Sequence, residues 1–241
     1  MKRLKNEPKE AFPYKPPSRE VFHKYSHIFS IKNELPPRFI KIFFDKTVAS
    51  IALIITLPVL ILLKVAFLIE GVLLPENKGP MLFYYNAVSA GTIIRKYKIR
   101  VIKTRFIDPI AAKKGDWIAY SAEWTKDSRT YVGQFVKKFY LDELPQFYSV
   151  LKGEISIVGP RPLSVLHYER DLSQGNLTRK LLKGGMLGLG HINKGTQELG
   201  NPTYEYEYLD QYLKRSSLRL LYLDLYIIWK GVKVIFKGGG H

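Results

Sequence analysis

Residues 137–162 read KKFYLDELPQFYSVLKGEISIVGPRP, and they combine two adjacent carboxylates with a proline-flanked arginine. Pro145 fits the first turn of a helix, because that position needs no backbone N–H. Gly153 fits the end of the same helix. We therefore predict a helix over residues 144–152, followed by a short buried strand over residues 155–158.

Asp142 and Glu143 stand just before this helix, and Arg161 lies between Pro160 and Pro162. A helix N-terminus favours ionised carboxylates and nearby phosphate. The two prolines restrict the backbone on both sides of the arginine. A rigid guanidinium beside two ionised acids indicates phosphate chemistry. The alternative is that the acids only neutralise the helix dipole, which is worth less than about 1 kcal/mol.

Composition limits the class of protein. The 241 residues fit one domain with appendages. Lys and Arg outnumber Asp and Glu by 38 to 21, and the formal charge of +17 implies an anionic partner. Nucleic acid, anionic lipid and phosphorylated substrates all qualify, but no nucleic-acid-binding motif is recognisable. The absence of cysteine excludes disulfides and thiolate metal sites.

The N-terminal part of the chain changes character near residue 48. Residues 1–37 are rich in basic residues and proline, which predicts an extended, partly disordered arm, either a solvated tail or one that adheres to an acidic surface. The uncharged run VASIALIITLPVLILL then occupies residues 48–63. These sixteen residues fall short of the roughly twenty that a straight spanning helix needs.

Three structures suit this apolar run. It can span the membrane with the help of residues after Lys64, it can be an unusually apolar core helix, or it can enter the membrane, bend at Pro58 and return to the same face. Basic residues flank the run on both sides, with Lys41 and Lys46 before it. The re-entrant form is favoured, because both ends then meet one anionic leaflet.

Two other segments carry candidate phosphate ligands. Residues 81–85 and 92–100 predict a β-hairpin. Its second strand places Lys98 and Arg100 on one face, directed either to a phosphate or to solvent. Lys183 is followed by several glycines, and a glycine-rich loop with a cation can wrap a phosphate through backbone N–H groups.

The C-terminal segments predict two more helices, over residues 163–172 and 216–236. In the second helix, apolar and aromatic side chains recur at helical spacing opposite Arg219, Lys230 and Lys233. Such a basic, Trp- and Tyr-containing helix is typical of a membrane interface. A core-facing helix is the alternative, because aromatic residues at this spacing also occur in cores.

Together these motifs resemble the signature of the bacterial sugar transferases, the monotopic phosphoglycosyl transferases. The resemblance rests on LDELPQ at 141–146, VLKG at 150–153 and SIVGPRPL at 156–163. It extends to YKIR at 97–100, which is similar to the family's Tyr-Lys-Phe-Arg, and to the polar DSRTYVG at 127–133. The family implies a fold as well as an activity.

The chain departs from the family pattern at three places. The family's hairpin element Gln-x-Arg-x-Gly reads AVSAG at 87–91, so the arginine is absent. The Ser-Pro pair of the membrane helix is replaced by Leu57 and Pro58. In the glycine-rich segment, Lys183 and His191 replace Arg and Gln. We therefore expect the central chemistry to be kept and the nucleotide or sugar contacts to differ.

The resemblance implies transfer of a sugar-1-phosphate from a UDP-sugar to a polyprenyl phosphate such as undecaprenyl phosphate. This would be a first membrane step of glycan or exopolysaccharide assembly, at the cytoplasmic face of the bacterial inner membrane. Asp142 would be the nucleophile that forms a covalent phosphosugar intermediate, and Glu143 would bind Mg²⁺ or order the site. The implied phosphate-binding side chains are Arg161, Lys98, Arg100, Arg129 and Lys183.

The implied architecture is α+β and mostly helical, as expected of a monotopic membrane protein. It comprises a basic arm at 1–37, a re-entrant helix bent at Pro58 within 38–74, a catalytic domain with a β-hairpin at 75–213 and an interfacial helix at 214–241. Anionic lipids would be partners, nucleic acid would not, and a homodimer is left open. A catalytically altered membrane scaffold for glycan enzymes is the alternative, motivated by the departures above.

Overall fold

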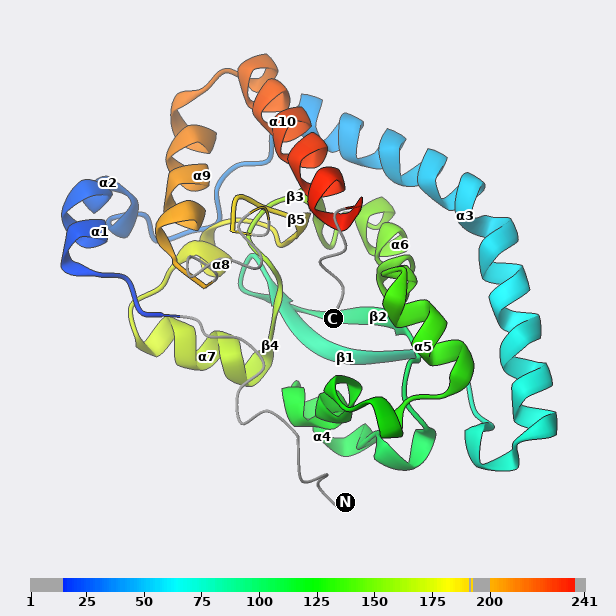
Figure 1. Cartoon of the computed structure of the whole chain (residues 1–241). Coiled ribbons are helices and arrows are strands. Elements are labelled where there is room, and N and C mark those ends of the chain that lie inside the picture. Colours follow the sequence, from blue (N-terminus) through cyan, green and yellow to red (C-terminus); the bar gives the residue numbers. More distant parts are fainter. Residues whose placement is uncertain (1–14, 191, 193–199, 237–241) are drawn as a thin grey trace.

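The computed structural model describes residues 15–190, 192 and 200–236, and it confirms a mostly helical α+β fold (Figure 1). The helices are α1 Arg19–Lys24, α2 Ser26–Phe29, α3 Phe39–Leu73, α4 Pro109–Lys114, α5 Tyr131–Lys138, α6 Gln146–Leu151, α7 Val165–Ser173, α8 Thr178–Leu181, α9 Thr203–Lys214 and α10 Ser217–Phe236. The strands are β1 Leu82–Ser89, β2 Thr92–Ile99, β3 Ser156–Val158, β4 Leu163–Ser164 and β5 Gly185–Leu187. Short 3₁₀ turns are η1 Pro75–Asn77, η2 Thr104–Phe106, η3 Trp117–Trp124, η4 Lys126–Ser128 and η5 Leu141–Glu143.

The predicted hairpin is present, with a longer first strand and a tighter turn than expected. β1 and β2 pair antiparallel from Leu82 opposite Ile99 to Ser89 opposite Thr92. Ala90 and Gly91 alone make the turn, with φ of 49° and 71°. Left-handed values at both turn residues match the right-handed twist of a hairpin. β4 adds to β1, giving the sheet order β2-β1-β4, and β3 pairs in parallel with β5.

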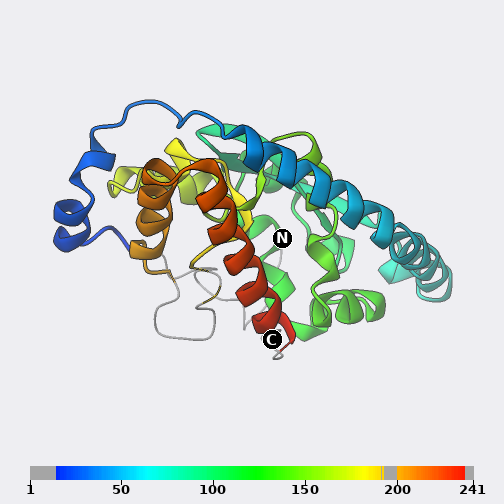
Figure 2. The ribbon, with the colours of Figure 1, turned by 90° about the horizontal axis from the view of Figure 1, so that it is seen from above.

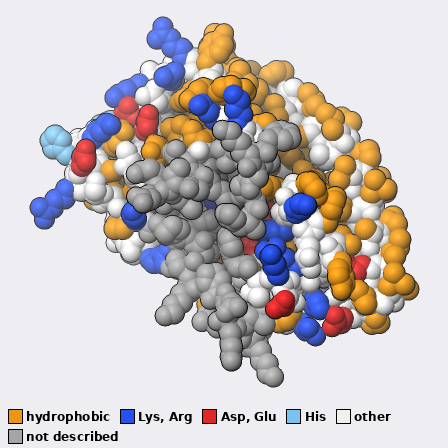
Figure 3. Space-filling view, in the orientation of Figure 1, with side chains coloured by type: hydrophobic (Ala, Val, Ile, Leu, Met, Phe, Trp, Pro, Cys, Tyr) orange, Lys and Arg blue, Asp and Glu red, His pale blue; other side chains and the backbone are white. Residues whose placement is uncertain are grey.

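Helix α3 is the longest element and arches along one edge of the molecule (Figures 1 and 2). It runs for 35 residues and continues through Pro58 without interruption. An 18-residue window with a mean hydropathy of 2.7 is only 11% buried. The hydrophobic side chains along this edge are visible in Figure 3. Because a soluble core helix would bury these side chains, that alternative is wrong.

Charged residues at the two ends of α3 are buried, in contrast to its exposed apolar middle. The Asp45 carboxylate accepts hydrogen bonds from Ser156 Oγ at 2.6 Å and the Ile157 N–H at 3.2 Å. Near the other end, Glu70 accepts from the Tyr131 N–H at 2.6 Å and from Asn77 Nδ2 at 2.8 Å. Both ends of α3 are therefore fixed to the same domain.

A buried ion pair joins α3 to α10. Lys41 Nζ lies 2.6 Å from Asp224 Oδ2, and the Tyr208 hydroxyl donates to Asp224 Oδ1 at 2.6 Å. Burial raises the pKa of Asp224 despite the neighbouring Lys41. We call Lys41, Asp45, Ser156, Tyr208 and Asp224 the anchor cluster. It ties α3, α9 and α10 to strand β3.

The N-terminal region differs from the prediction. Residues 15–37 were expected to be extended, but α1 and α2 form there and bury Val21, Tyr25 and Ile28. The Tyr25 ring stacks on Tyr206 of α9 with a centroid distance of 5.9 Å. The physical reason is that apolar residues recur every three or four positions within this basic segment. Residues 1–14 of the predicted arm lie outside the described residues.

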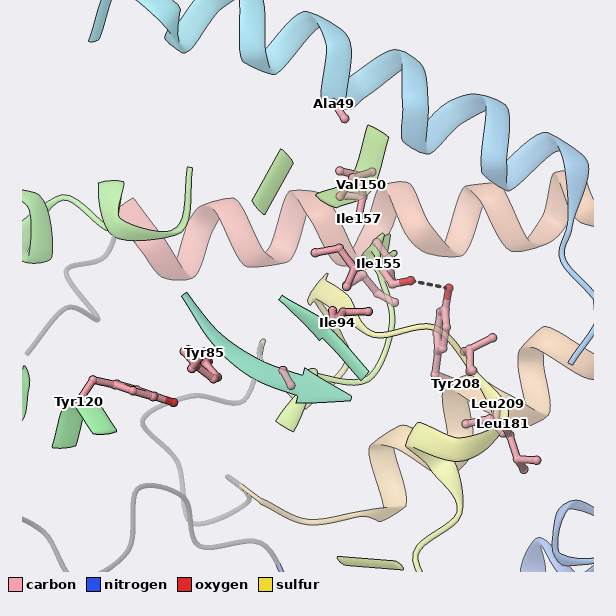
Figure 4. Packing of buried hydrophobic residues seen from close by; sticks show 14 of the residues in the cluster. Ala49, Tyr85, Ile94, Tyr120, Val150, Ile155, Ile157, Leu181, Tyr208 and Leu209 are labelled. Atoms are coloured by element: carbon pink, nitrogen blue, oxygen red, sulfur yellow. Dashed lines mark hydrogen bonds between the residues drawn. The ribbon is translucent and has the colours of Figure 1, made fainter. Parts of the chain in front are cut away.

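The hydrophobic core lies between the sheet and the helices around it. Figure 4 shows Ile94 of the hairpin, Ile155 and Ile157 near β3, and Ala49 of α3 directed towards Val150 of α6. The predicted helix at 216–236 is present as α10, which buries Leu220 and Ile227 and exposes a separate apolar face. That exposed face consists of Leu218, Tyr222, Leu225, Tyr226, Trp229 and Val232.

Candidate active site

The acidic pair lies in a sharp connection between α5 and α6. Tyr140, a non-glycine residue with a φ of 55°, turns the chain immediately before η5. A left-handed conformation costs such a residue on the order of 1 kcal/mol. The predicted helix begins slightly later than expected, at Gln146, and Gly153 ends it with a φ of 75°. The strained turn places Asp142 against strand β2.

Two lysines hold the Asp142 carboxylate. Lys98 Nζ lies 3.1 Å and Lys137 Nζ 3.6 Å from the same oxygen, Oδ2. Asp142 is only 2% exposed, and a buried carboxylate needs such partners to stay ionised. Within the described part of the chain, no hydrogen bond or ion pair is made to the other oxygen, Oδ1. One oxygen is thus fixed by two lysines, while the other has no polar partner among the described residues.

A third acid, Glu123, completes this group from the distant segment η3. Its Oε2 atom lies 3.4 Å from both Lys98 Nζ and Lys137 Nζ. Burial would raise the pKa of Glu123, but the two ammonium groups outweigh burial and lower it to about 2. Burial likewise opposes the charged form of Lys98, yet Glu123 and Asp142 together raise the Lys98 pKa. Glu123 and Lys98 are therefore both charged at neutral pH.

Glu143 points to a different partner. Arg161 Nη2 lies 2.8 Å from Glu143 Oε1, so the arginine loop reaches back to the acidic pair as predicted. Burial would raise the pKa of Glu143, but Arg161, followed by Lys96, lowers it well below the ordinary value. The Glu143 side chain is 25% exposed, in contrast to Asp142. Glu143 is thus an ionised carboxylate that is open to solvent.

The arginine loop is held by the glycine-rich segment rather than by its own prolines alone. Gly185 N–H donates to the Pro160 carbonyl at 2.7 Å, and Gly159 N–H donates to the Leu187 carbonyl at 2.8 Å. A Cβ on Gly185 would lie 2.0 Å from the Gly159 nitrogen. The two backbones therefore approach more closely than any side chain would allow. Gly184 and Gly185 belong to the glycine-rich segment that was predicted to wrap a phosphate. In the structure they pack against the arginine loop instead.

Arg179 fixes the same loop from the other side. Its Nε donates to the Arg161 carbonyl at 2.8 Å, and its Nη1 lies 2.8 Å from Asp171 Oδ2. Glu205 of α9 also pairs with the Arg179 guanidinium. Arg179 is buried and held in a fixed position by these acids. The backbone at Arg161 is therefore attached to α7, α8 and α9.

Three predicted phosphate ligands have other partners. Arg100 is fully buried and donates to the carbonyls of Pro80, Ile102 and Asn77 at 2.8 to 2.9 Å. Its guanidinium holds the hairpin base, because carbonyl groups of three segments converge on it. The structure does not bring Arg100 to the acidic pair. No other observation supports its predicted phosphate role.

Arg129 and Lys183 also lie apart from the acidic pair. Arg129 Nε donates to the Glu123 carbonyl at 2.9 Å and lines a polar cavity of about 240 Å³ with Lys103 and Lys126. Lys183 Nζ donates to the Gly153 carbonyl at 2.8 Å. Arg129 therefore contacts the backbone of Glu123 and not its carboxylate. Lys183 supports the C-terminal end of α6.

Sequence reasoning missed three charged residues of the site. Glu123 carried no local signal, and Lys137 was part of the decisive stretch but had no assigned role. Lys96 stands two residues before Lys98 and is 2% exposed. A period of two places Lys96 and Lys98 on the same face of β2, and this spacing was the available signal. We call Lys96, Lys98, Glu123, Lys137, Asp142, Glu143 and Arg161 the catalytic cluster.

The carboxylates present fit a magnesium ion shared with substrate. Among the described residues, no three His, Cys, Asp or Glu side chains converge as a metal cage. Mg²⁺ does not need one, because it commonly binds through one or two carboxylates together with substrate phosphates. Glu143 is ionised and partly exposed, which suits this mode. A fixed Asp142 lies beside it.

Comparison with known proteins decides the family. The model of the bacterial sugar transferase family matches residues 36–238, which is most of the chain. The chain belongs to this family. The matched region contains α3, the hairpin, the acidic pair and the arginine loop. The predicted family assignment is therefore confirmed.

Three relatives of the chain have names that describe sugar-phosphate transfer. The chain is 34% identical over 197 residues to the UDP-glucose:undecaprenyl-phosphate glucose-1-phosphate transferase of Klebsiella pneumoniae, covering 80% of this chain and 37% of that protein. It is 30% identical to the undecaprenyl-phosphate galactose phosphotransferase of Salmonella typhimurium, covering 91% and 46%. It is 28% identical to an N-acetylgalactosaminephosphotransferase of Aeromonas hydrophila, covering 86% and 47%. The chain spans less than half the length of each relative.

Proposed function

We propose that this sugar transferase moves a sugar-1-phosphate from a UDP-sugar to undecaprenyl phosphate or a similar polyprenyl phosphate. The observation that carries the proposal is the Asp142 carboxylate, which is buried, held at one oxygen by two lysines, and adjacent to the Glu143–Arg161 pair. The names of the relatives support the substrate classes, since they pair a UDP-sugar or a sugar phosphate with undecaprenyl phosphate.

The first step is nucleophilic attack by Asp142. Its Oδ1 atom bonds to the β-phosphorus of the UDP-sugar, the bond from that phosphorus to the bridging oxygen breaks, and UMP leaves with the electron pair. The product is an aspartyl phosphosugar, which divides one difficult transfer into two easier ones. Lys98 and Lys137 hold the carboxylate in position, and buried cations stabilise the charge that develops on the phosphoryl oxygens.

The second step regenerates the carboxylate. An oxygen of the polyprenyl phosphate attacks the same phosphorus, the acyl phosphate bond breaks, and the lipid diphosphate sugar is released. Arg161 is suited to bind phosphate oxygens through two N–H groups. Mg²⁺, held by Glu143 and substrate phosphates, would reduce repulsion between the two anions.

The position of α3 supports a membrane-surface site for this reaction. We propose that α3 is re-entrant and bends near Pro58, because Asp45 and Glu70 fix its two ends to one domain while its middle exposes apolar side chains. The exposed aromatic face of α10 would lie in the interface, on the cytoplasmic side of the bacterial inner membrane. A lipid phosphate at the interface and a nucleotide from water would then reach one site.

The membrane arrangement is testable by cysteine labelling, because the chain contains no cysteine of its own. Single cysteines at Lys32 and Lys78 flank α3. A membrane-impermeant maleimide should label both from the same side of sealed vesicles of defined orientation. Labelling of the two positions from opposite sides would show a spanning helix and contradict the re-entrant proposal.

Activity is tested with the purified chain, a panel of UDP-sugars and undecaprenyl phosphate, with UMP release as the measurement. One UDP-sugar should release UMP in the presence of Mg²⁺, and EDTA should abolish the release. Labelled UMP should exchange into the UDP-sugar without any lipid acceptor if the intermediate is covalent. Exchange that requires the acceptor would contradict the covalent step, and no release from any UDP-sugar would favour the scaffold alternative.

A further inference from the structure

Lys96 differs from the other basic side chains of the catalytic cluster, because it has no partner of opposite charge. Lys98 and Lys137 each pair with Glu123 and Asp142, and Arg161 pairs with Glu143. For Lys96 the described residues provide neither a hydrogen bond nor an ion pair. Among the described residues, its ammonium group has one cation–π contact, with the Tyr85 ring, whose centroid lies 6.0 Å from Nζ. The cluster therefore contains four basic side chains and three acidic ones.

The surroundings of Lys96 do not replace a counter-charge. The side chain is 2% exposed, so water offers little solvation. Tyr85 is directly opposite Lys96 in the hairpin register, and contact with a ring at the limit of cation–π range is weak. Burial, followed by the nearby positive charge of Arg161, lowers the pKa of Lys96 well below the ordinary value. An unpaired buried cation is destabilising, so the fold gains nothing from a lysine at this position.

The position of Lys96 shows where the missing negative charge would lie. Its side chain shares a face of β2 with Lys98, which contacts Asp142. It is also within electrostatic reach of Glu143 and Arg161. Since Glu143 is partly exposed, this part of the cluster is open to a ligand from solvent. An anion bound beside Arg161 would pair with Lys96 as well.

We propose that Lys96 binds a phosphate group of the substrate, together with Arg161. A phosphate oxygen supplies the counter-charge that the protein lacks, and the cluster becomes balanced only when the ligand is bound. The ligand class is a phosphate monoester or a nucleoside diphosphate. Both the nucleotide and the lipid phosphate contain a phosphate group that Lys96 can bind. This inference rests on the proposed function for its substrates, but phosphate binding by Lys96 can be measured without turnover.

The experiment compares the full chain with Lys96→Met and Lys96→Arg in detergent micelles. Isothermal titration with UMP and, separately, with dodecyl phosphate measures binding in two arms that represent the nucleotide and the lipid. Lys96→Met should raise the dissociation constant of at least one of the two ligands by at least about tenfold. This is a typical effect of removing a charged hydrogen-bond donor. Lys96→Arg should retain part of the affinity. Arg95→Met is the matched control, because Arg95 is the exposed neighbour on the opposite face.

Thermal unfolding separates ligand binding from a structural role. Without ligand, Lys96→Met should unfold at or above the temperature of the native chain, because the variant removes an unpaired buried charge. The ligand should raise the unfolding temperature of the native chain and of Arg95→Met more than that of Lys96→Met. The arm in which affinity falls identifies the phosphate that Lys96 contacts.

Two results would overturn the inference. One is native affinity of Lys96→Met for both ligands. The other is a large drop in its unfolding temperature together with unchanged affinity per folded molecule, which would make Lys96 a structural residue. If the native chain turned over no UDP-sugar but Lys96→Met still lost phosphate binding, the proposed function would fail while the phosphate site remained.

Discussion

The catalytic cluster and the anchor cluster are both groups of buried charges, but only the anchor cluster is complete without a ligand. In the anchor cluster, Asp45 accepts from Ser156 and Ile157, and Asp224 accepts from Lys41 and Tyr208. In the catalytic cluster, Lys96 has no counter-charge among the described residues, and Oδ1 of Asp142 has no donor there. The charges that fix α3 are saturated by the protein, whereas the charges proposed to act on a substrate leave a bonding position open.

The largest expected effect comes from removing the open carboxylate. Asp142→Asn should lower kcat by at least about 10⁴-fold, because an amide cannot replace the nucleophile. Single-turnover UMP release measures this loss. The comparison variant is Asp224→Asn in the anchor cluster, which should keep kcat per folded molecule close to native. Full turnover by Asp142→Asn would contradict the proposed mechanism.

Breaking the anchor cluster should affect stability instead. Lys41→Met leaves Asp224 buried without its cation, and the free energy of unfolding should fall by about 4 kcal/mol. The double variant with Asp224→Asn should regain part of that loss, because the unpaired charge is removed. Denaturant unfolding in micelles measures both. A double variant less stable than Lys41→Met would contradict the role of the ion pair.

The catalytic cluster should also contribute stability that depends on pH. The pKa of Glu123 is about 2 in the folded protein, against an ordinary value of 4.5. A carboxyl with a lowered folded pKa stabilises the protein above its unfolded pKa, and the contribution disappears as pH falls through the folded pKa. Glu123→Gln should therefore cost about 3 kcal/mol at pH 7.

This difference from the native chain should shrink between about pH 4.5 and pH 2. Acid unfolding curves of the two proteins measure it. A constant difference across that range would show that Glu123 acts through packing rather than through its charge. Above about pH 6 the difference should be nearly independent of pH, since Glu123 is then almost fully ionised in both folded and unfolded chains.

The smallest effect is expected for Lys183, which lies in neither cluster. Lys183→Met removes one hydrogen bond to the Gly153 carbonyl and should lower the free energy of unfolding by about 1 kcal/mol. Its kcat/KM should remain within about threefold of native. A tenfold higher KM for the UDP-sugar would restore the phosphate-binding role that the sequence predicted.

Local patterns predicted those parts of the site that are close together in the sequence. Asp142, Glu143 and the proline-flanked Arg161 lie within 20 residues, and the turn and helix signals between them are strong. The hairpin was predicted because strand alternation and Gly91 are also local features. The apolar run likewise indicated α3, although the helix extends beyond it at both ends.

Features that depend on distant segments could not be predicted in this way. Glu123 reaches Lys98 through η3, 25 residues away, and nothing in its immediate sequence indicates that contact. Arg100 was predicted to face a phosphate, because alternation along the strand gives the side on which its side chain lies. Alternation does not show that three backbone carbonyls from other segments occupy that side. The glycines after Lys183 are as compatible with a phosphate-binding loop as with close backbone packing. Only the close approach of Gly185 to Gly159 in the structure shows that they pack against the arginine loop.

The anchor cluster also determines the order in which the protein can be completed during synthesis. Lys41 and Asp224 are 183 residues apart, so at about 5 to 20 residues per second the lysine emerges some 10 to 40 s before its partner. Asp45 likewise precedes Ser156 by 111 residues. The apolar middle of α3 must therefore be shielded during translation while its charged ends are still hydrated. Helix α10, which is synthesised long after α3, fixes α3 in place through the Lys41–Asp224 ion pair.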